Sequence, residues 1–382
     1  MIDYLLLALF IPVSVCIFWF IELFFTSGEN KKAKKHLSFF MLCGLISFTG
    51  GLLYFKELYS IYAIVYVVIL VLSMAQIPAL YLYLLSLTEN NLNRNTYYKH
   101  YAFPAFTGVI IVYFHYIYIT YDDLITVFNN YFTPWELTQK QIVTYYIDLI
   151  LRNGFVLLGI IYLSFMHIKV KRHFRKVKDY YSNVERKRLY WITLSTSTYF
   201  LFALIGVTLF NSQSKAAIYK NELILSIPFL IMAMVFWYIG FLGNRQQLII
   251  IPTAVMENKP QFFFTEDLKE NLVNKMKQTT ETDKLYLNPD LCLPDLAREI
   301  GTNRYYLSKI INDEFGMNFN NYINQYRIAE AVKLMNNAEN NYSLAEIATK
   351  CGFNAYMSFV RNFKRFEKVS PEGYLKRMRI NG

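Results

Sequence analysis

The stretch that decides the fold of the C-terminal region is "LCLPDLAREIGTNRYYLSKII", residues 291–311. Its pattern predicts two short helices that meet at a tight turn. Pro294 suits the first turn of the first helix, because its φ is already fixed near the helical value. Gly301 can adopt the left-handed conformation that ends a helix, and Ala297 is small enough for two helices to cross closely. The stretch therefore predicts a helix-turn-helix.

The second helix of this pair has one apolar and one polar face. Leu307, Ile310 and Ile311 fall on the face that is expected to pack inward. The opposite face carries side chains that can hydrogen-bond to the base edges or phosphates of DNA. They are Asn303, Arg304, Tyr305, Ser308, Lys309 and Asn312. A single motif of this kind also occurs in proteins that do not bind DNA.

The same pattern recurs in "SLAEIATKCGFNAYMSFVRNFKRF", residues 343–366. Ser343 and Glu346 form a capping box that predicts the start of a helix. Ala348 precedes Gly352 by four residues, the same interval as in the first pair. The following helix is expected to turn these polar side chains outward: Asn354, Ser358, Arg361, Lys364 and Arg365. Two such motifs, joined by a long predicted helix, are far more specific than one.

Together these motifs resemble the DNA-binding domain of AraC/XylS-type transcription regulators. The resemblance covers residues 286–378 and rests on "LAREIG", "YYLSKIIN", "YRIAEAVKLM", "EIATKCGF", "FVRNFKRF" and "VSPEGYLK". It implies two helix-turn-helix units on one long helix, with recognition helices at residues 303–314 and 354–366 that each enter a major groove. Duplex DNA is therefore an expected partner.

Three positions depart from the family pattern. Lys368 stands where the family usually has glycine before the "VSP" segment. Tyr356 and Met357 stand where small or polar groove residues are usual, so we expect them among the DNA-facing side chains of the second unit. These two positions concern the sequence preference of that unit and not its fold.

The N-terminal part of the chain has the composition of a membrane protein. Charged residues make up 18% of the chain and hydrophobic ones 54%, whereas a soluble chain carries about 25% charged residues. Seven apolar segments approach or exceed the roughly 20 residues that a helix needs to cross a bilayer. They are Ile2–Phe25, Leu37–Tyr54, Ile61–Leu87, Tyr101–Ile119, Ile142–Ile168, Leu189–Phe210 and Leu223–Leu242. The first has no basic start and is expected to be a span rather than a leader.

The charges between these segments predict an orientation. Three alternate loops carry 15 Lys and Arg residues, nine of them between residues 169 and 188, whereas the opposite loops carry 4. Loops rich in Lys and Arg stay in the cytoplasm. The N-terminus is therefore expected outside and the C-terminus inside. The layout resembles the membrane-tethered, seven-span members of the AraC/XylS family, which implies a bacterial inner membrane.

Three polar residues inside the apolar segments are candidates for sensing a signal. Asp148 and Arg152 lie four residues apart and share a helical face. Charged residues at this depth are costly and usually functional. The alternative is a self-neutralising pair that only packs two helices. Gln76 lies two residues before Pro78 and is the third candidate.

No pattern in the sequence predicts an enzyme. The four cysteines, Cys16, Cys43, Cys292 and Cys351, show neither a disulfide framework nor the spacing of a metal site, and no Gly-rich phosphate loop or paired-carboxylate motif occurs. We therefore expect no catalytic residues, no metal and no cofactor.

These patterns predict an all-α protein with three regions. Residues 1–243 form a seven-helix transmembrane sensor, residues 244–284 a connector with an amphipathic helix, and residues 285–382 a cytoplasmic domain with two helix-turn-helix units joined by a long helix. The predicted function is a membrane-embedded one-component transcription regulator whose unknown small-molecule or membrane signal changes homodimerisation or the freedom of the DNA-binding arm. The alternative is a membrane transporter with a C-terminal regulatory domain.

The predicted orientation can be tested with reporter fusions. Fusions after Lys56, Asn130 and Ser212 should report an external position and a fusion after Lys176 an internal one, because the basic loops are retained in the cytoplasm. Alkaline phosphatase and green fluorescent protein read the two sides independently. A fusion at the C-terminus that reports an external position would contradict both the orientation and the expected contact with DNA.

Overall fold

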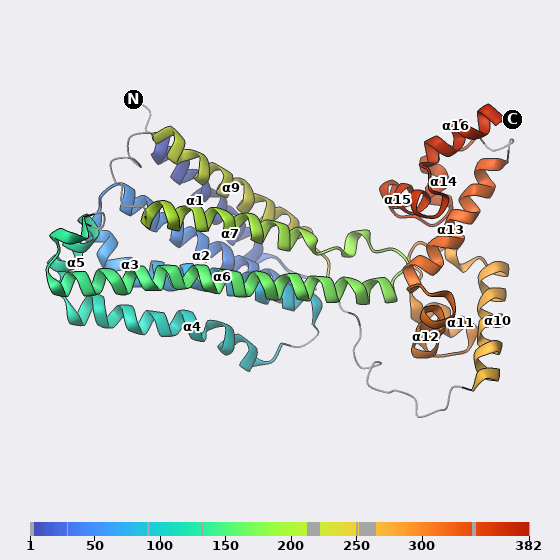
Figure 1. The fold of residues 1–382 in the computed structure, drawn as a ribbon, viewed down its shortest axis with the longest axis horizontal. Coiled ribbons are helices and arrows are strands. Elements are labelled where there is room, and N and C mark those ends of the chain that lie inside the picture. The colour runs from blue at the N-terminus through green and yellow to red at the C-terminus, as the bar shows by residue number, and fades with distance from the viewer. Residues whose placement is uncertain are drawn as a thin grey trace. The chain divides into compact units, whose positions relative to one another are not determined.

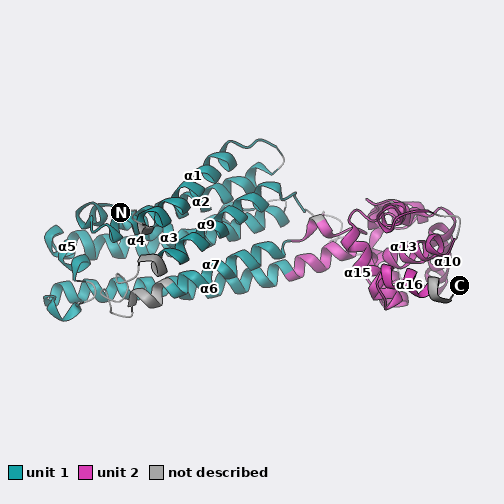
Figure 2. Cartoon of the chain, turned by 90° about the horizontal axis from the view of Figure 1, so that it is seen from above, with its two compact units in different colours: residues 1–170, 189–250 teal, residues 171–188, 251–382 magenta. Residues whose placement is uncertain are grey.

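The computed structural model describes residues 4–28, 30–89, 92–130, 133–211, 222–249, 251, 265–337 and 341–381. Within these ranges the chain is helical and has no β-strand, only an isolated bridge between Tyr181 and Cys292. The chain divides into two compact units (Figure 1, Figure 2). Unit 1 comprises residues 1–170 and 189–250, and unit 2 comprises residues 171–188 and 251–382. The all-helical fold expected from the sequence is confirmed.

Unit 1 is a bundle of long helices (Figure 1). They are α1 (Tyr4–Phe25), α2 (Lys31–Phe55), α3 (Tyr59–Thr88), α4 (Arg94–Val112), the start of α6 (Gln139–Tyr180), α7 (Tyr190–Asn211) and α9 (Glu222–Arg245). Among the described residues, six of these helices are long and apolar enough to cross a membrane: α1, α2, α3, α4 with the π-helix η1 that continues it (Tyr113–Tyr118), α6 and α9. The short α5 (Tyr121–Asn129) caps one end. Over its described side chains, α7 qualifies only as a shorter apolar helix.

The outer surface of unit 1 is strongly apolar. Phe25 of α1 is 77% exposed, and large side chains on α4 and α6 such as Phe106, Ile150 and Leu157 are more than 60% exposed. Monomeric soluble proteins rarely expose contiguous apolar surface on this scale. An apolar outer surface of this kind is compatible with a bundle that lies in a membrane.

The helix α6 is longer than the sequence pattern predicted. The expected span ended at Ile168 and was followed by a basic loop, but the helix continues to Tyr180. The expected end was wrong because apolar content marks the membrane-crossing part, whereas helical hydrogen bonds continue through basic residues that are good helix formers. The boundary between the two units falls within α6, after Val170.

Unit 2 contains two small cores on one long helix. Its helices are α10 (Glu266–Thr282), α11 (Leu293–Ile300), α12 (Arg304–Phe315), α13 (Phe319–Asn336), α14 (Leu344–Lys350), α15 (Tyr356–Glu367) and α16 (Pro371–Asn381). The first half of α13 packs with α10, α11 and α12, and its second half packs with α14 and α15. Residues 252–264 of the connector expected at 244–284, and the loop at residues 212–221, which holds one fusion site, lie outside the described residues.

The turns of unit 2 have the conformations that the sequence predicted. Gly301 ends α11 with φ +78°, and the capping box of Ser343 and Glu346 starts α14. Gly352 follows α14 with φ +82°, and a Cβ there would lie 2.6 Å from the carbonyl oxygen of Leu287. Lys368, which replaces the family's usual glycine, also has a positive φ of +63°. Both helix pairs therefore use the same kind of turn.

A buried arginine joins separate parts of unit 2. Arg327 of α13 is fully buried, and its guanidinium donates hydrogen bonds to the carbonyl oxygens of Tyr286 (2.6 Å) and Asn288 (2.8 Å) and to Oγ of Ser182 (3.1 Å). It also lies 5.6 Å from the ring centre of Phe353. Burial lowers the pKa of Arg327 to about 9, so the group stays charged at neutral pH. The stability of unit 2 therefore depends on one charged side chain.

Replacement of this arginine should destabilise unit 2. Arg327→Leu removes three hydrogen bonds and leaves buried carbonyl groups without a donor, which should cost about 3 kcal/mol. Urea-dependent pulse proteolysis of the full-length chain in detergent, following the fragment that contains unit 2, measures the change. Arg298→Leu is the matched control, since that side chain is 75% exposed. Equal urea midpoints for both variants would contradict the proposed role of Arg327.

Candidate nucleic-acid interface and buried polar cluster

The polar face predicted on the first recognition helix lies on α12. Asn303 is the N-cap of this helix, and its side-chain oxygen accepts a hydrogen bond from the backbone nitrogen of Tyr306 (3.0 Å). Leu307, Ile310 and Ile311 are buried, as expected. The remaining predicted side chains are exposed or half-buried: Arg304, Tyr305, Ser308, Lys309 and Asn312. These side chains therefore lie at least partly on the surface of α12, and their contact with DNA stays a prediction.

The second polar face lies on α15, with one correction. Asn354, Met357, Arg361 and Lys364 are exposed. Arg365 is also exposed and donates to the side-chain oxygen of Asn321 (2.5 Å), while the Tyr356 hydroxyl donates to the Glu372 carboxylate (2.6 Å). Ser358 is only 6% exposed, so the expectation that it faces outward was wrong. Its burial follows because α15 packs against both α13 and α14, which widens its buried face.

Two of the predicted DNA-contacting arginines meet a different part of the chain. Arg361 forms an ion pair with Glu185. The guanidinium of Arg304 lies 5.9 Å from the ring centre of Tyr180. Both partners belong to residues 171–188, which are assigned to unit 2 although they lie between α6 and α7 in the sequence. No sequence pattern predicted these contacts.

A cluster of charged and polar groups is buried in unit 1. Asp148 is 1% exposed, and its carboxylate accepts a hydrogen bond from Nε of Arg152 (2.7 Å). The hydroxyl of Tyr66 in α3 donates to the same carboxylate and accepts from Nη2 of Arg152 (3.2 Å). The expected pairing within α6 is therefore confirmed, and Tyr66 ties it to a second helix.

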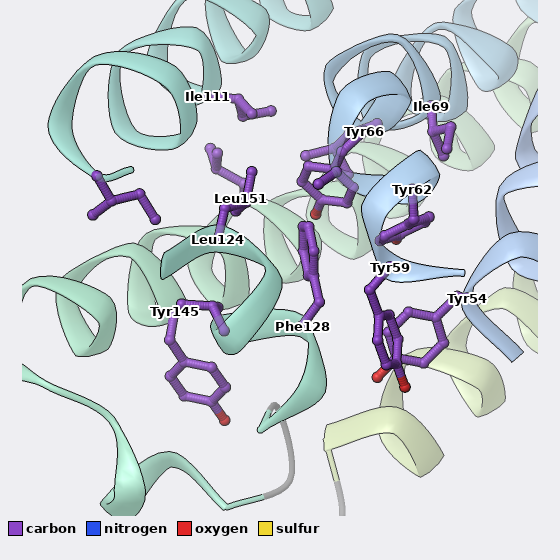
Figure 3. Packing of buried hydrophobic residues seen from close by; sticks show 14 of the residues in the cluster. Tyr54, Tyr59, Tyr62, Tyr66, Ile69, Ile111, Leu124, Phe128, Tyr145 and Leu151 are labelled. Carbon is purple, nitrogen blue, oxygen red and sulfur yellow. The ribbon is translucent and has the colours of Figure 1, made fainter. Parts of the chain in front are cut away.

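The aromatic surroundings of this cluster include a histidine. His115 lies in η1 and stacks on Tyr66, with ring centres 5.0 Å apart and planes 9° apart. Phe128 of α5 packs against Tyr66 at 5.0 Å, and Figure 3 shows both rings within the packed core. His115 is 2% exposed, and neither of its ring nitrogens has a hydrogen-bond partner in the described part of the chain. Segments of π-helix often occur at functional sites.

Sequence reasoning did not select Tyr66 or His115. A lone histidine in an apolar segment was a weak signal, while Tyr66 is one of 32 tyrosines and had none. Gln76, which the sequence did select, is 2% exposed and accepts from the Tyr199 hydroxyl (2.7 Å). It follows Tyr66 by ten positions in α3, roughly 15 Å along the helix axis. The structure therefore does not bring Gln76 to the Asp148–Arg152 pair.

Comparison with known proteins finds a match to a domain family within unit 2. Residues 296–377 match the model of a helix-turn-helix domain. The chain is 30% identical over 108 residues to the regulatory protein PocR of Salmonella typhimurium, which is 28% of this chain and 35% of PocR. It is 30% identical over 105 residues to the transcriptional regulatory protein HptR of Staphylococcus aureus, which is 28% of this chain and 38% of HptR. No solved structure matches.

These matches confirm the resemblance found in the sequence. The C-terminal part of the chain carries a helix-turn-helix domain of the AraC type, a DNA-binding domain of transcription regulators. The chain spans little more than a third of the length of the curated relatives that it matches. The match lies wholly within unit 2 and does not extend to the apolar helices.

The buried pair should show strong coupling on mutation. Arg152→Leu leaves the Asp148 carboxylate buried without its cation, which should destabilise unit 1 by about 3 kcal/mol. Adding Asp148→Asn should recover part of this loss, because the unpaired charge is then gone. Unfolding in mixed dodecylmaltoside and sodium dodecyl sulfate micelles measures each variant. Arg94→Leu, at an exposed position, is the control; additive losses in the double variant would contradict coupling.

Proposed function

We propose that this chain is a membrane-embedded, one-component transcription regulator. The observation that carries the proposal is the presence, in one chain, of an AraC-type helix-turn-helix domain and six apolar helices long enough to span a membrane. A DNA-binding domain joined to a membrane bundle couples a membrane event to a gene without a diffusing messenger.

The DNA-reading part uses two helix-turn-helix units, α11 with α12 and α14 with α15, joined by α13. The helices α12 and α15 enter major-groove segments one helical turn apart, roughly 34 Å. On α12, Arg304 and Asn312 are suited to base edges. On α15, Lys364 and Arg365 attract phosphates, and Met357, which is 63% exposed, offers apolar contact. The stretch from residue 350 to residue 382 supports phosphate attraction, since it has 8 basic and 2 acidic residues.

The sensing part is unit 1, and the regulator lies in a bacterial inner membrane. Its N-terminus is outside and its DNA-binding domain is in the cytoplasm, as the loop charges support. In this topology α7 is the seventh span. The N-terminal region to residue 243 receives the signal, and residues 285–382 bind the promoter, as a monomer or a homodimer.

The buried cluster of unit 1 is the proposed signal-sensitive element. The motivating observation is the set of polar groups in an apolar bundle: the Tyr66–Asp148–Arg152 contacts and the two unpartnered ring nitrogens of His115 among the described residues. Polar groups in this setting are costly and are usually kept for function. A signal acts here only if it has different affinities for two arrangements of the bundle. Gln76, with its contact to Tyr199, is a second candidate on α3.

The DNA-reading proposal predicts different behaviour for two basic residues. With the full-length chain in nanodiscs and a duplex selected from a random pool, Arg304→Ala should cost about 1–3 kcal/mol on the selected duplex and reduce discrimination against a scrambled one. Lys364→Ala should weaken binding to both duplexes equally and lower the salt slope by about one unit. Fluorescence anisotropy at several salt concentrations measures both effects.

Two results would count against this proposal. Equal losses on both duplexes for Arg304→Ala would remove this residue from base recognition. Failure of the folded, full-length chain to bind any duplex at low salt would contradict the function as a DNA-binding regulator.

A further inference from the structure

The segment at residues 171–188 belongs to the membrane-proximal part of the sequence but to the DNA-binding unit of the structure. It contains the last turns of α6 and the turn that leads to Leu189 at the start of α7. We call it the 171–188 segment. Its contacts within unit 2 are polar and specific, and they involve side chains proposed above to bind DNA.

The centre of the 171–188 segment is anchored by Ser182. This residue is fully buried, and its backbone nitrogen and Oγ both donate to the carbonyl oxygen of Leu291, at 3.1 and 2.7 Å. Its own carbonyl oxygen accepts from the amide of Asn320, and its Oγ accepts from Arg327. Four hydrogen bonds would thus be lost if Ser182 moved away from the rest of unit 2.

The next residue connects the two halves of the DNA-binding domain. The side-chain nitrogen of Asn183 donates to the carbonyl oxygens of Pro289 (2.5 Å), just before α11, and Gly352 (3.1 Å), just after α14. On the other side of Ser182, Tyr181 forms an antiparallel bridge with Cys292. The 171–188 segment therefore contacts the loop before the first helix pair and the turn within the second.

The same segment contacts both proposed recognition helices. The Glu185 carboxylate pairs with Arg361 on α15, and the Tyr180 ring lies against the guanidinium of Arg304 on α12. The Glu185 carboxylate holds Arg361 as a DNA phosphate would, and the Tyr180 ring lies beside Arg304 on the face of α12 that is proposed to meet DNA. Arg361 cannot keep its ion pair with Glu185 and bind a DNA phosphate at the same time, and a duplex that approaches Arg304 meets the neighbouring Tyr180 ring.

We infer that the 171–188 segment is an internal competitor of DNA: its docking on unit 2 and the binding of duplex DNA to Arg304 and Arg361 exclude each other. This inference rests on the proposed function and adds its regulation. The docked chain described here is the DNA-free state. Release of the segment removes its contacts with both arginines. It also breaks the link that Asn183 makes between the two helix pairs.

The position of the segment in the chain supplies the means of control. It continues without interruption from α6, which carries Asp148 and Arg152, and it leads directly into α7. A rearrangement of either helix in unit 1 is therefore transmitted by covalent connection to Ser182 and Glu185. If the undocked fraction at rest is roughly 10–30%, complete release strengthens the apparent DNA affinity roughly three- to tenfold.

Variants that weaken docking should strengthen DNA binding. The protein is the full-length chain in nanodiscs, and the probe is a fluorescein-labelled 30-base-pair duplex of random sequence at low salt. Asn183→Ala removes two docking hydrogen bonds without a change of charge and should tighten binding roughly threefold or more. Glu185→Gln should do the same. Glu270→Gln, at an exposed site on α10, makes the same charge change and should have a much smaller effect.

A covalent lock tests the inference in the opposite direction. Residues paired across an antiparallel bridge have Cα atoms about 4.5–5.5 Å apart, within the range that a disulfide spans. Tyr181→Cys should therefore form a disulfide with the native Cys292 under mild oxidation. The locked chain should bind the probe at least threefold more weakly than the same chain after reduction with dithiothreitol. Tyr181→Cys combined with Cys292→Ser should show no redox response.

The possible outcomes separate this inference from the proposed function. Weaker binding when locked and tighter binding for Asn183→Ala would support competition. Failure of the disulfide to form, or a locked chain that binds the duplex as well as the reduced one, would overturn the inference and leave the regulator function standing. Absence of DNA binding by wild type, reduced and Asn183→Ala chains alike would overturn the proposed function itself.

Discussion

The buried guanidinium of Arg327 is the interaction on which the arrangement of unit 2 depends. It holds the loop before α11, the long helix α13 and the 171–188 segment through hydrogen bonds to Tyr286, Asn288 and Ser182. Removing a charge from water is costly unless its donors are satisfied, so these acceptors must stay in place together. Because burial lowers its pKa only to about 9, Arg327 keeps its charge across the neutral range.

This constraint ties the helix-turn-helix domain to a segment that lies outside its match to known regulators. The match to known regulators covers residues 296–377, whereas the partner of Arg327 at residue 182 lies more than a hundred positions earlier in the chain. The end of α11 and helices α12 to α15 lie within the matched residues. The 171–188 segment lies outside that match, and its contacts with unit 2 are the basis of the proposed regulation through α6 and α7.

Unit 1 also contains a buried charged group that is held by specific partners. Asp148 and Arg152 neutralise each other within α6, and Tyr66 extends the pair to α3. A pair satisfied in this way can remain in an apolar bundle, while the unpartnered nitrogens of His115, stacked on Tyr66, leave hydrogen-bonding capacity unused among the described residues. This cluster is the proposed signal-sensitive element, and its Asp148 and Arg152 lie on the helix that continues into the 171–188 segment.

The sequence alone determined the features that depend on local chemistry. The turn at Gly301, the capping box at Ser343 and the pairing of Asp148 with Arg152 follow from spacing along one helix, and the apolar segments follow from composition. Tertiary structure decided whatever depends on contacts between distant residues. It buried Ser358, because α15 meets two helices at once, and it placed Glu185 on Arg361. A polar side chain looks the same in the sequence whether its partner is water, DNA or another part of the chain, so only the folded arrangement could reveal that 171–188 occupies the residues predicted to read DNA.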